Sequence, residues 1–108
     1  MNQGDVYWHT FQPPDKRRPV LIVMSNSAIP NATEIIVVSI TSTIRGIRSE
    51  VLLTPEEDGV LVDCVVSADN IHTVPKASLE SFLTHLSGDR MREVREAIEY
   101  SFGFDAIR

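Results

Sequence analysis

The side chains that could do chemistry in this chain of 108 residues gather in three short segments. Residues 16–19, Lys-Arg-Arg-Pro, place a basic triplet where a loop leads into an apolar run. A guanidinium held at the start of a strand can grip a phosphate through two parallel hydrogen bonds. A solvated turn with one surface ion pair explains the same residues. The triplet therefore indicates either an anion site or an ordinary surface turn.

The other two segments offer hydroxyls and a mixed polar strand. Ile40-Thr41-Ser42-Thr43 places three hydroxyls where an apolar run ends, although threonine is also an ordinary strand former. Residues 68–73, Ala-Asp-Asn-Ile-His-Thr, alternate in direction if they form a strand, so Asn70 and His72 share one face and Asp69 lies on the other. Turn capping and exposed polar residues are the alternative for this segment.

Motifs for metals and activated nucleophiles are missing from the sequence. The three histidines are far apart and have no zinc-ligand spacing, and the chain has no phosphate-cradling Gly-rich loop. Cys64, the single cysteine, lies within a strand-like apolar run, which favours a buried structural thiol. We therefore expect no metal and no cofactor, and either metal-free chemistry or plain binding.

Charge and composition restrict the partners and the compartment. The net charge of −5 repels phosphate, so a nucleic-acid role requires a local basic patch. Residues 1–54 carry five Lys/Arg against four Asp/Glu, whereas residues 55–108 carry five against eleven. A lone cysteine excludes an intramolecular disulfide, and no apolar stretch reaches the ~20 residues of a membrane span. We expect a cytoplasmic protein with no membrane association.

The elements that must position these residues form one mainly β domain covering residues 1–108. Runs rich in β-branched and aromatic residues predict strands, at Asp5–Phe11, Arg18–Ser25, Ile35–Ser42, Glu50–Leu53, Leu61–Val66, Ala68–Thr73 and Phe82–Leu86. The second and third of these have apolar residues on both faces, which is expected inside a small covered barrel. Helical periodicity from Met91 to Phe102 predicts a C-terminal amphipathic helix, capped by Ser87 or Asp89 and ended by Gly103.

The order and spacing of these segments resemble the MazF/PemK/Kid family of bacterial toxin endoribonucleases, relatives in fold of the gyrase poison CcdB. The likeness begins with residues 4–8, Gly-Asp-Val-Tyr-Trp, and continues through Arg18–Val23 and Val38–Ser42. It resumes at Ala68–Thr73 and the final helix. The resemblance implies an SH3-like barrel that belongs to a toxin–antitoxin system and cleaves single-stranded RNA at short sequences.

The resemblance also implies roles for particular residues. Arg18 and Thr41 match the family's catalytic arginine and threonine, and Asp69 matches an aspartate that some members use in catalysis. The implied reaction is attack of a ribose 2′-hydroxyl on phosphorus, giving a 2′,3′-cyclic phosphate and a 5′-hydroxyl. We expect Arg18 to stabilise charge and Thr41 to orient the phosphate. His72 stands where relatives often carry arginine and is a candidate RNA contact.

Several departures from the family pattern bear on RNA binding. The loop at residues 12–17 is short and contains Pro13-Pro14 where many relatives are Gly-rich, and Ser67 replaces an arginine that some relatives use. Affinity should therefore depend on the remaining basic residues, which are Lys16, Arg17, Arg18, Arg45 and Arg48. A solvated loop is the alternative for the last two.

The resemblance implies two protein partners, and the residues leave two other functions open. The implied partners are a second copy of the chain and an antitoxin whose acidic, flexible tail would occupy the RNA groove. The alternatives are a catalytically inactive or CcdB-like protein that binds DNA gyrase or serves as a repressor partner, and a scaffold without a nucleic-acid role.

Overall fold

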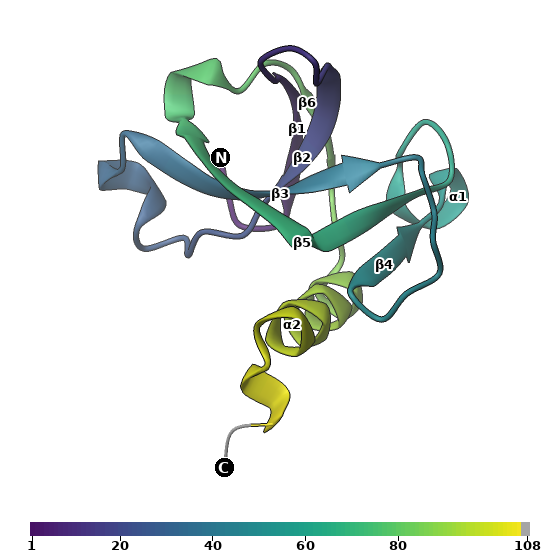
Figure 1. Cartoon of the computed structure of the whole chain (residues 1–108). Helices are drawn as coiled ribbons and strands as arrows, with labels where there is room; N and C mark the ends of the chain where they lie inside the picture. The colour runs from purple at the N-terminus through teal and green to yellow at the C-terminus, as the bar shows by residue number, and fades with distance from the viewer. Residues whose placement is uncertain (107–108) are drawn as a thin grey trace.

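A computed structural model describes residues 1–106 as six strands, a C-terminal helix and several short helical turns (Figure 1). The strands are β1 (Asp5–Thr10), β2 (Arg17–Ile22), β3 (Glu34–Thr41), β4 (Glu50–Leu53), β5 (Cys64–Pro75) and β6 (Phe82–His85). The helical segments are η1 (Ile29–Asn31), α1 (Pro55–Asp58), η2 (Lys76–Ser78), α2 (Gly88–Phe102) and η3 (Phe104–Ala106). Among these described residues, no helix is long and apolar enough to cross a membrane.

The six strands form one antiparallel sheet in the order β4-β5-β3-β2-β1-β6. The sheet curls into a half-barrel, and α2 lies against β4 and β5 (Figure 1). This arrangement confirms the predicted mainly β, SH3-like barrel with a C-terminal helix. The central position of β2 and β3 matters most for the site, because the ends of these two strands carry Arg18 and Thr41.

Both faces of the central strands are buried, as their sequences predict. Leu21 and Val38 point into the larger core, which α2 closes with Val94 and Ala97. The alternate residues of the same two strands enter a second core on the opposite face, made of Val20, Ile22, Ile29, Ile35, Val37 and Val74. Two cores clamp β2 and β3 from both sides, so the ends of these strands are rigid supports for side chains.

Strand β5 differs from the prediction, which divided this region into two strands at Ser67. The structure has one strand of 12 residues, and its pairing with β3 is irregular between Val38 and Ile40. The strand continues through Ser67 because Val66 and Ala68 on either side are both fully buried in the larger core. Ser67 pairs with Glu50 of β4, so the polar residue inside this apolar run lies within the strand and the chain does not turn there.

Helix α2 is confirmed together with both of its predicted ends. The Ser87 hydroxyl accepts a hydrogen bond from the backbone N–H of Arg90 at 3.1 Å, and Gly103 ends the helix with φ of 76°. The first turn of the helix is tied to α1 by Arg90, whose Nε lies 3.0 Å from Oδ1 of the buried Asp58. This pair and the packing on β4 and β5 together fix the position of α2.

Candidate active site

Arg18 and Thr41 are brought together by the register of β2 and β3. Val20 lies opposite Ser39 in this antiparallel pair, so continuing the same register by two residues places Arg18 opposite Thr41 on one face of the sheet. Nη1 of Arg18 donates a hydrogen bond to Oγ1 of Thr41 at 3.3 Å. The two side chains are half-buried, so the pair is held by the sheet yet reaches the surface.

The hydroxyl of Thr41 is oriented by its two hydrogen-bond donors. Its oxygen accepts from Arg18 at 3.3 Å and from the backbone N–H of Thr43 at 3.2 Å. A hydroxyl has two acceptor lone pairs and one donor hydrogen, so its hydrogen is left to donate to a ligand. Arg18 has five N–H donors and uses one of them on Thr41. The pair therefore presents several hydrogen-bond donors and a positive charge, which suits a phosphate.

Two hollows meet at this pair. A groove of about 180 Å³ on one side is lined by Phe11, Asp15, Ser39, Asn70 and His72 in addition to Arg18 and Thr41. A more apolar pocket of about 260 Å³ lies on the other side, and its lining includes Trp8, Lys16, Leu61 and Leu83. Arg18 and Thr41 border both hollows, so a chain of nucleotides could follow this surface with one phosphate at the pair.

The basic triplet divides into one arginine with an acidic partner and two cations without one. Nε of Arg17 lies 2.8 Å from the Glu80 carboxylate, and its guanidinium stacks over Trp8 at 4.4 Å. Hydrogen bonds from Thr10 and then Arg17 hold the pKa of Glu80 below its ordinary value. Within residues 1–106, Lys16 and Arg18 form no ion pair. These two cations supply the positive charge that borders the apolar pocket.

Arg45 and Arg48 lie in the loop between β3 and β4, and both have acidic partners. The side chain of Glu50 is 2% exposed and accepts from Nε of Arg45 at 3.1 Å and from the backbone N–H of Gly46 at 2.9 Å. Burial raises the pKa of Glu50, but the hydrogen bonds from Arg45, Gly46 and their neighbours outweigh burial and lower it. Neither arginine lines the two hollows beside Arg18.

Arg48 joins the same loop to the C-terminal end of α2. Its guanidinium lies 4.4 Å from the ring centroid of Tyr100 and 3.4 Å from the carboxylate of Asp105. Both contacts are at the surface, where they are screened by solvent. The loop is therefore docked on the helix, and its two arginines can contact RNA only by sharing or giving up these partners.

Asp69 is not brought together with Arg18 and Thr41. Its two carboxylate oxygens accept hydrogen bonds from Ser49 at 2.7 Å and from Ser101 at 2.5 Å, which places the carboxylate between the β3–β4 loop and α2. The bonds from Ser101 and then Ser49 lower the pKa of Asp69. Alternation along β5 explains the separation, because Asn70 and His72 face the groove and Asp69 points away from it.

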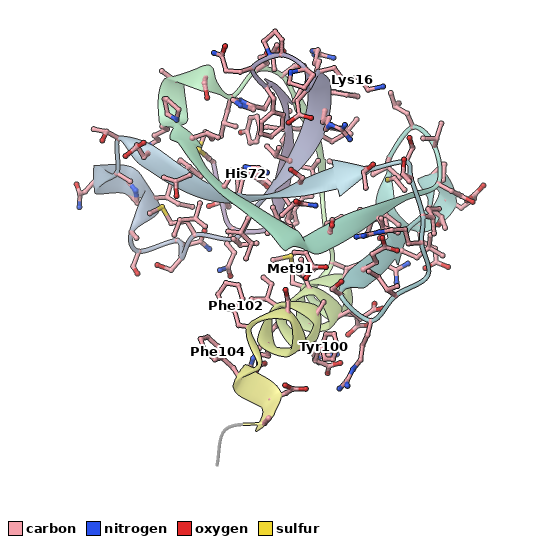
Figure 2. All side chains as sticks on the ribbon, in the orientation of Figure 1. Lys16, His72, Met91, Tyr100, Phe102 and Phe104 are labelled. Carbon is pink, nitrogen blue, oxygen red and sulfur yellow. The ribbon has the colours of Figure 1, made fainter. Side chains whose placement is uncertain are left out.

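His72 lies in the groove, as its predicted RNA contact requires (Figure 2). Two groove residues that the sequence analysis did not propose as contacts are Phe11 and Asn70. The predicted alternation did place Asn70 on the face of His72, and that signal could have identified it. Phe11 had no such signal, because its proximity to β5 depends on how the sheet curls.

The chain matches known proteins along almost its whole length. Residues 2–102 match the family described as the PemK-like, MazF-like toxin of type II toxin–antitoxin systems. The chain is 35% identical over 103 residues to the probable endoribonuclease MazF2 of Mycobacterium tuberculosis, covering 95% of this chain and 99% of that protein. It is also 31% identical to the endoribonuclease MazF of Staphylococcus saprophyticus, covering 100% of this chain and 96% of that protein.

Solved structures give the same result for the fold. The Mycobacterium tuberculosis toxin MazF-mt6 superposes with a TM-score of 0.83 at 31% identity, covering 92% of this chain and 96% of that one. A mycobacterial endoribonuclease in complex with its cognate antitoxin superposes with a TM-score of 0.84 at 27% identity, covering 95% of both chains. The half-barrel and α2 are therefore shared with toxins of this kind.

Proposed function

Because this chain belongs to the PemK-like, MazF-like toxin family and is an endoribonuclease of a toxin–antitoxin system, we propose that it cleaves single-stranded RNA at the Arg18–Thr41 pair without a metal. The observation that carries the proposal is the hydrogen-bond pattern of Thr41. Both acceptor positions of its hydroxyl are used by protein donors, so the hydroxyl and the Arg18 guanidinium together offer donors to one anion. A gyrase-binding or inactive protein is not favoured by relatives that are named endoribonucleases.

The proposed reaction is an internal transfer at one phosphate of the RNA. The ribose 2′-oxygen forms a bond to phosphorus as the bond from phosphorus to the 5′-oxygen breaks, leaving a 2′,3′-cyclic phosphate and a 5′-hydroxyl. The 2′-hydroxyl loses its proton and the 5′-oxygen gains one, so no water is consumed. Negative charge grows on the phosphate oxygens in the transition state, and the donors of Arg18 and Thr41 stabilise it there.

Lys16 extends the positive surface beside this pair and would contact a neighbouring phosphate. The predicted contacts of Arg17, Arg45 and Arg48 stay predictions, with the added requirement that RNA competes with Glu80, Glu50 and Asp105. Such exchanges cost little for Arg17 and Arg48, whose pairs are exposed, and more for Arg45, whose partner Glu50 is buried. Because its proposed substrate is single-stranded RNA inside the cell, we propose that the protein acts in the cytoplasm.

The antitoxin is the protein partner that the family implies, and toxins of this fold have been solved with theirs. Its acidic, flexible tail would bind the groove at Lys16 and Arg18, because a surface that attracts phosphate also attracts carboxylates. Inhibition would then be competitive with RNA. An antitoxin peptide that leaves the affinity for RNA unchanged would contradict this arrangement.

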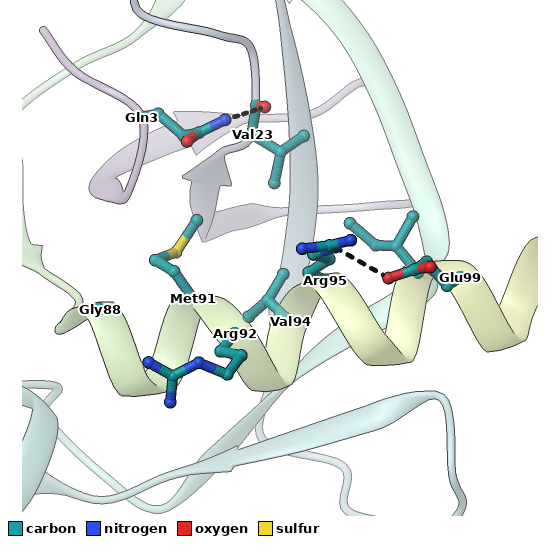
Figure 3. A pocket seen from close by; sticks show the side chains of 9 residues that line it. Gln3, Val23, Gly88, Met91, Arg92, Val94, Arg95 and Glu99 are labelled. Carbon is teal, nitrogen blue, oxygen red and sulfur yellow. Dashed lines mark hydrogen bonds and ion pairs between the residues drawn. The ribbon is translucent and has the colours of Figure 1, made fainter. Parts of the chain in front are cut away.

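The second proposed partner is another copy of this chain, bound through the surface around α2. Phe102 and Phe104 lie together at its C-terminal end, with ring centroids 5.3 Å apart, and are 54% and 53% exposed (Figure 2). A groove of about 460 Å³ along the same helix is lined by Met91 and Val94 and by the Arg95–Glu99 ion pair (Figure 3). Light scattering that gives the mass of one chain at micromolar concentration would exclude the dimer.

The experiment that tests the cleavage is digestion of a long defined RNA in excess EDTA, with the 5′-ends of the fragments mapped and their chemistry determined. The wild type should give discrete cuts with 5′-hydroxyl ends. Arg18→Ala should lower kcat about 10²–10³-fold, as expected for loss of a charge-stabilising donor. Thr41→Val should lower it as well, and Thr41→Ser, which keeps the hydroxyl, should retain most activity. Cleavage by Arg18→Ala at the wild-type rate, or fragments with 5′-phosphates, would contradict the proposal.

A further inference from the structure

The groove beside Arg18 and Thr41 has an aromatic wall. The ring centroid of Phe11 lies 5.0 Å from that of His72 on β5. On its other side Phe11 meets the ring of His9 edge-on at 4.5 Å, and His9 is buried. Nδ1 of His9 lies 3.3 Å from the hydroxyl of Ser78, which ties this inner ring to η2. Phe11 and His72 line the groove, and the buried His9, which does not line it, packs against Phe11.

Asn70 adds a fixed hydrogen-bonding group to the same wall. Its residue is exposed, yet its Nδ2 donates to Oγ of Ser67 at 3.0 Å, and Ser67 is only 1% exposed. An asparagine amide has two donor hydrogens and one acceptor oxygen, so this bond leaves one donor and the acceptor for a ligand. An exposed asparagine usually samples several rotamers, whereas this one is held by a buried hydroxyl. The amide is thus oriented before any ligand arrives.

The chemistry of the rest of the groove lining suits a nucleobase better than a second phosphate. Arg18 and Thr41 supply the donors for one anion. The other lining residues include two aromatic rings, an amide and the carboxylate of Asp15, which repels a second anion and can accept a hydrogen bond from an amino group. Proteins bind unpaired RNA bases by stacking them on aromatic side chains and by hydrogen bonds to their edges. An amide that offers one donor and one acceptor can pair with an acceptor and a donor on the same base edge.

We propose that Phe11, His72 and Asn70 form a nucleobase subsite that selects the nucleotide next to the cleaved phosphate. Phe11 and His72 provide the stacking surface, and the Asn70 amide reads the edge of the base. The subsite rests on the proposed cleavage at Arg18 and Thr41 for its place beside the scissile phosphate. It assigns part of the sequence preference of the enzyme to one residue, Asn70, that does not take part in the chemistry.

The first arm of the test measures cleavage of an RNA library randomised at every position, with the cut sites read by sequencing. Asn70→Ala should reduce the preference at one nucleotide position beside the cut by about tenfold, the usual size of one base-edge contact. Phe11→Leu, which removes the ring and keeps an apolar side chain, should weaken binding of every base at that position by about tenfold. Thr73→Ala is the matched control, because Thr73 is on the same strand with its side chain on the opposite face.

The second arm measures binding of short 2′-fluoro oligonucleotides, which lack the attacking hydroxyl and therefore cannot be cleaved by the proposed route. The wild type should prefer one base at one position, and Asn70→Ala should lose that preference. If the wild type cuts no RNA but this binding preference is present and depends on Asn70, the subsite stands and the proposed cleavage fails. Preferences that are unchanged in Asn70→Ala and Phe11→Leu, or absent from the wild type, would overturn the subsite.

Discussion

Replacing Arg90 by methionine should destabilise the fold strongly, because it leaves Asp58 buried without its cation. The Asp58 side chain is 3% exposed, and Arg90 meets it through Nε at 3.0 Å and Nη2 at 3.2 Å. These bonds with Asp58 raise the pKa of Arg90, although burial opposes the rise. Methionine keeps the length of the apolar stem, so the variant removes the charge and its hydrogen bonds with little loss of packing.

The magnitude follows from what remains around Asp58 after the substitution. Its Oδ2 keeps one hydrogen bond, from the backbone N–H of Thr54 at 2.9 Å. Breaking a buried pair on one side costs about 3–5 kcal/mol, and the lower figure applies here because Arg90 is 18% exposed and water can replace part of it. With a urea m-value of about 1.5 kcal/mol/M, a loss of ~3 kcal/mol lowers the unfolding midpoint by about 2 M.

The assay is urea unfolding followed by circular dichroism, with the protein concentration held constant because a dimer unfolds in a concentration-dependent way. Arg92→Met is the matched control on the same helix. Arg92 pairs with Asp89 through side chains that are 67% and 87% exposed, and such a surface pair contributes less than about 1 kcal/mol. Arg90→Met with Asp58→Asn should recover part of the loss. Equal midpoints for Arg90→Met and Arg92→Met would refute the reasoning.

Two further predictions concern Asp69 and Cys64. The hydroxyls of Ser101 and Ser49 lower the pKa of Asp69 in the folded protein, so its carboxylate stabilises the fold above the unfolded pKa of 3.8. This contribution is lost as the pH falls through the folded pKa. The destabilisation by Asp69→Asn, measured by urea unfolding, should therefore be present at pH 7 and shrink below pH 3.8. If Asp69 positions the β3–β4 loop, Asp69→Asn should change KM more than kcat, whereas a large fall in kcat would support its predicted catalytic role. Burial raises the pKa of Cys64 to about 11, with Asp58 and Asp63 adding to the rise, so the native thiol should react with a disulfide reagent at pH 8 far more slowly than in urea; equal rates would contradict its burial.

The alternation and runs of apolar residues predict the fold well, because consecutive apolar residues indicate that both faces of β2 and β3 are buried. The same strands carry Arg18 and Thr41 at their ends, so a resemblance over short motifs was enough to propose the pair. The hydrogen-bond partners of Asp69 could not be predicted from the sequence, because Ser49 and Ser101 are 20 and 32 residues away in the chain. Their contact depends on how α2 packs against the β3–β4 loop, and the sequence has no local signal for that packing.

The counter-ions of the basic residues were unpredictable for the same reason. Arg17 meets Glu80 across 63 residues, and Arg48 meets Asp105 across 57. A count of basic residues treats each as available to RNA, whereas the folded chain neutralises some of them internally. Acidic residues of the second half thus pair with some basic residues of the first half. Lys16 and Arg18 form no such pair within residues 1–106, so a local cationic surface there is compatible with a net charge of −5.

The two hydrogen bonds accepted by Thr41 have a consequence for the pH dependence of cleavage. With both lone pairs engaged, its oxygen is a poor acceptor for the proton of the attacking hydroxyl, and a guanidinium has no lone pair to offer. The pair can hold the phosphate and stabilise its charge, but it cannot serve as the general base. Any bend in the pH–rate profile near neutrality must therefore belong to a group outside the pair, in the protein or in the RNA itself.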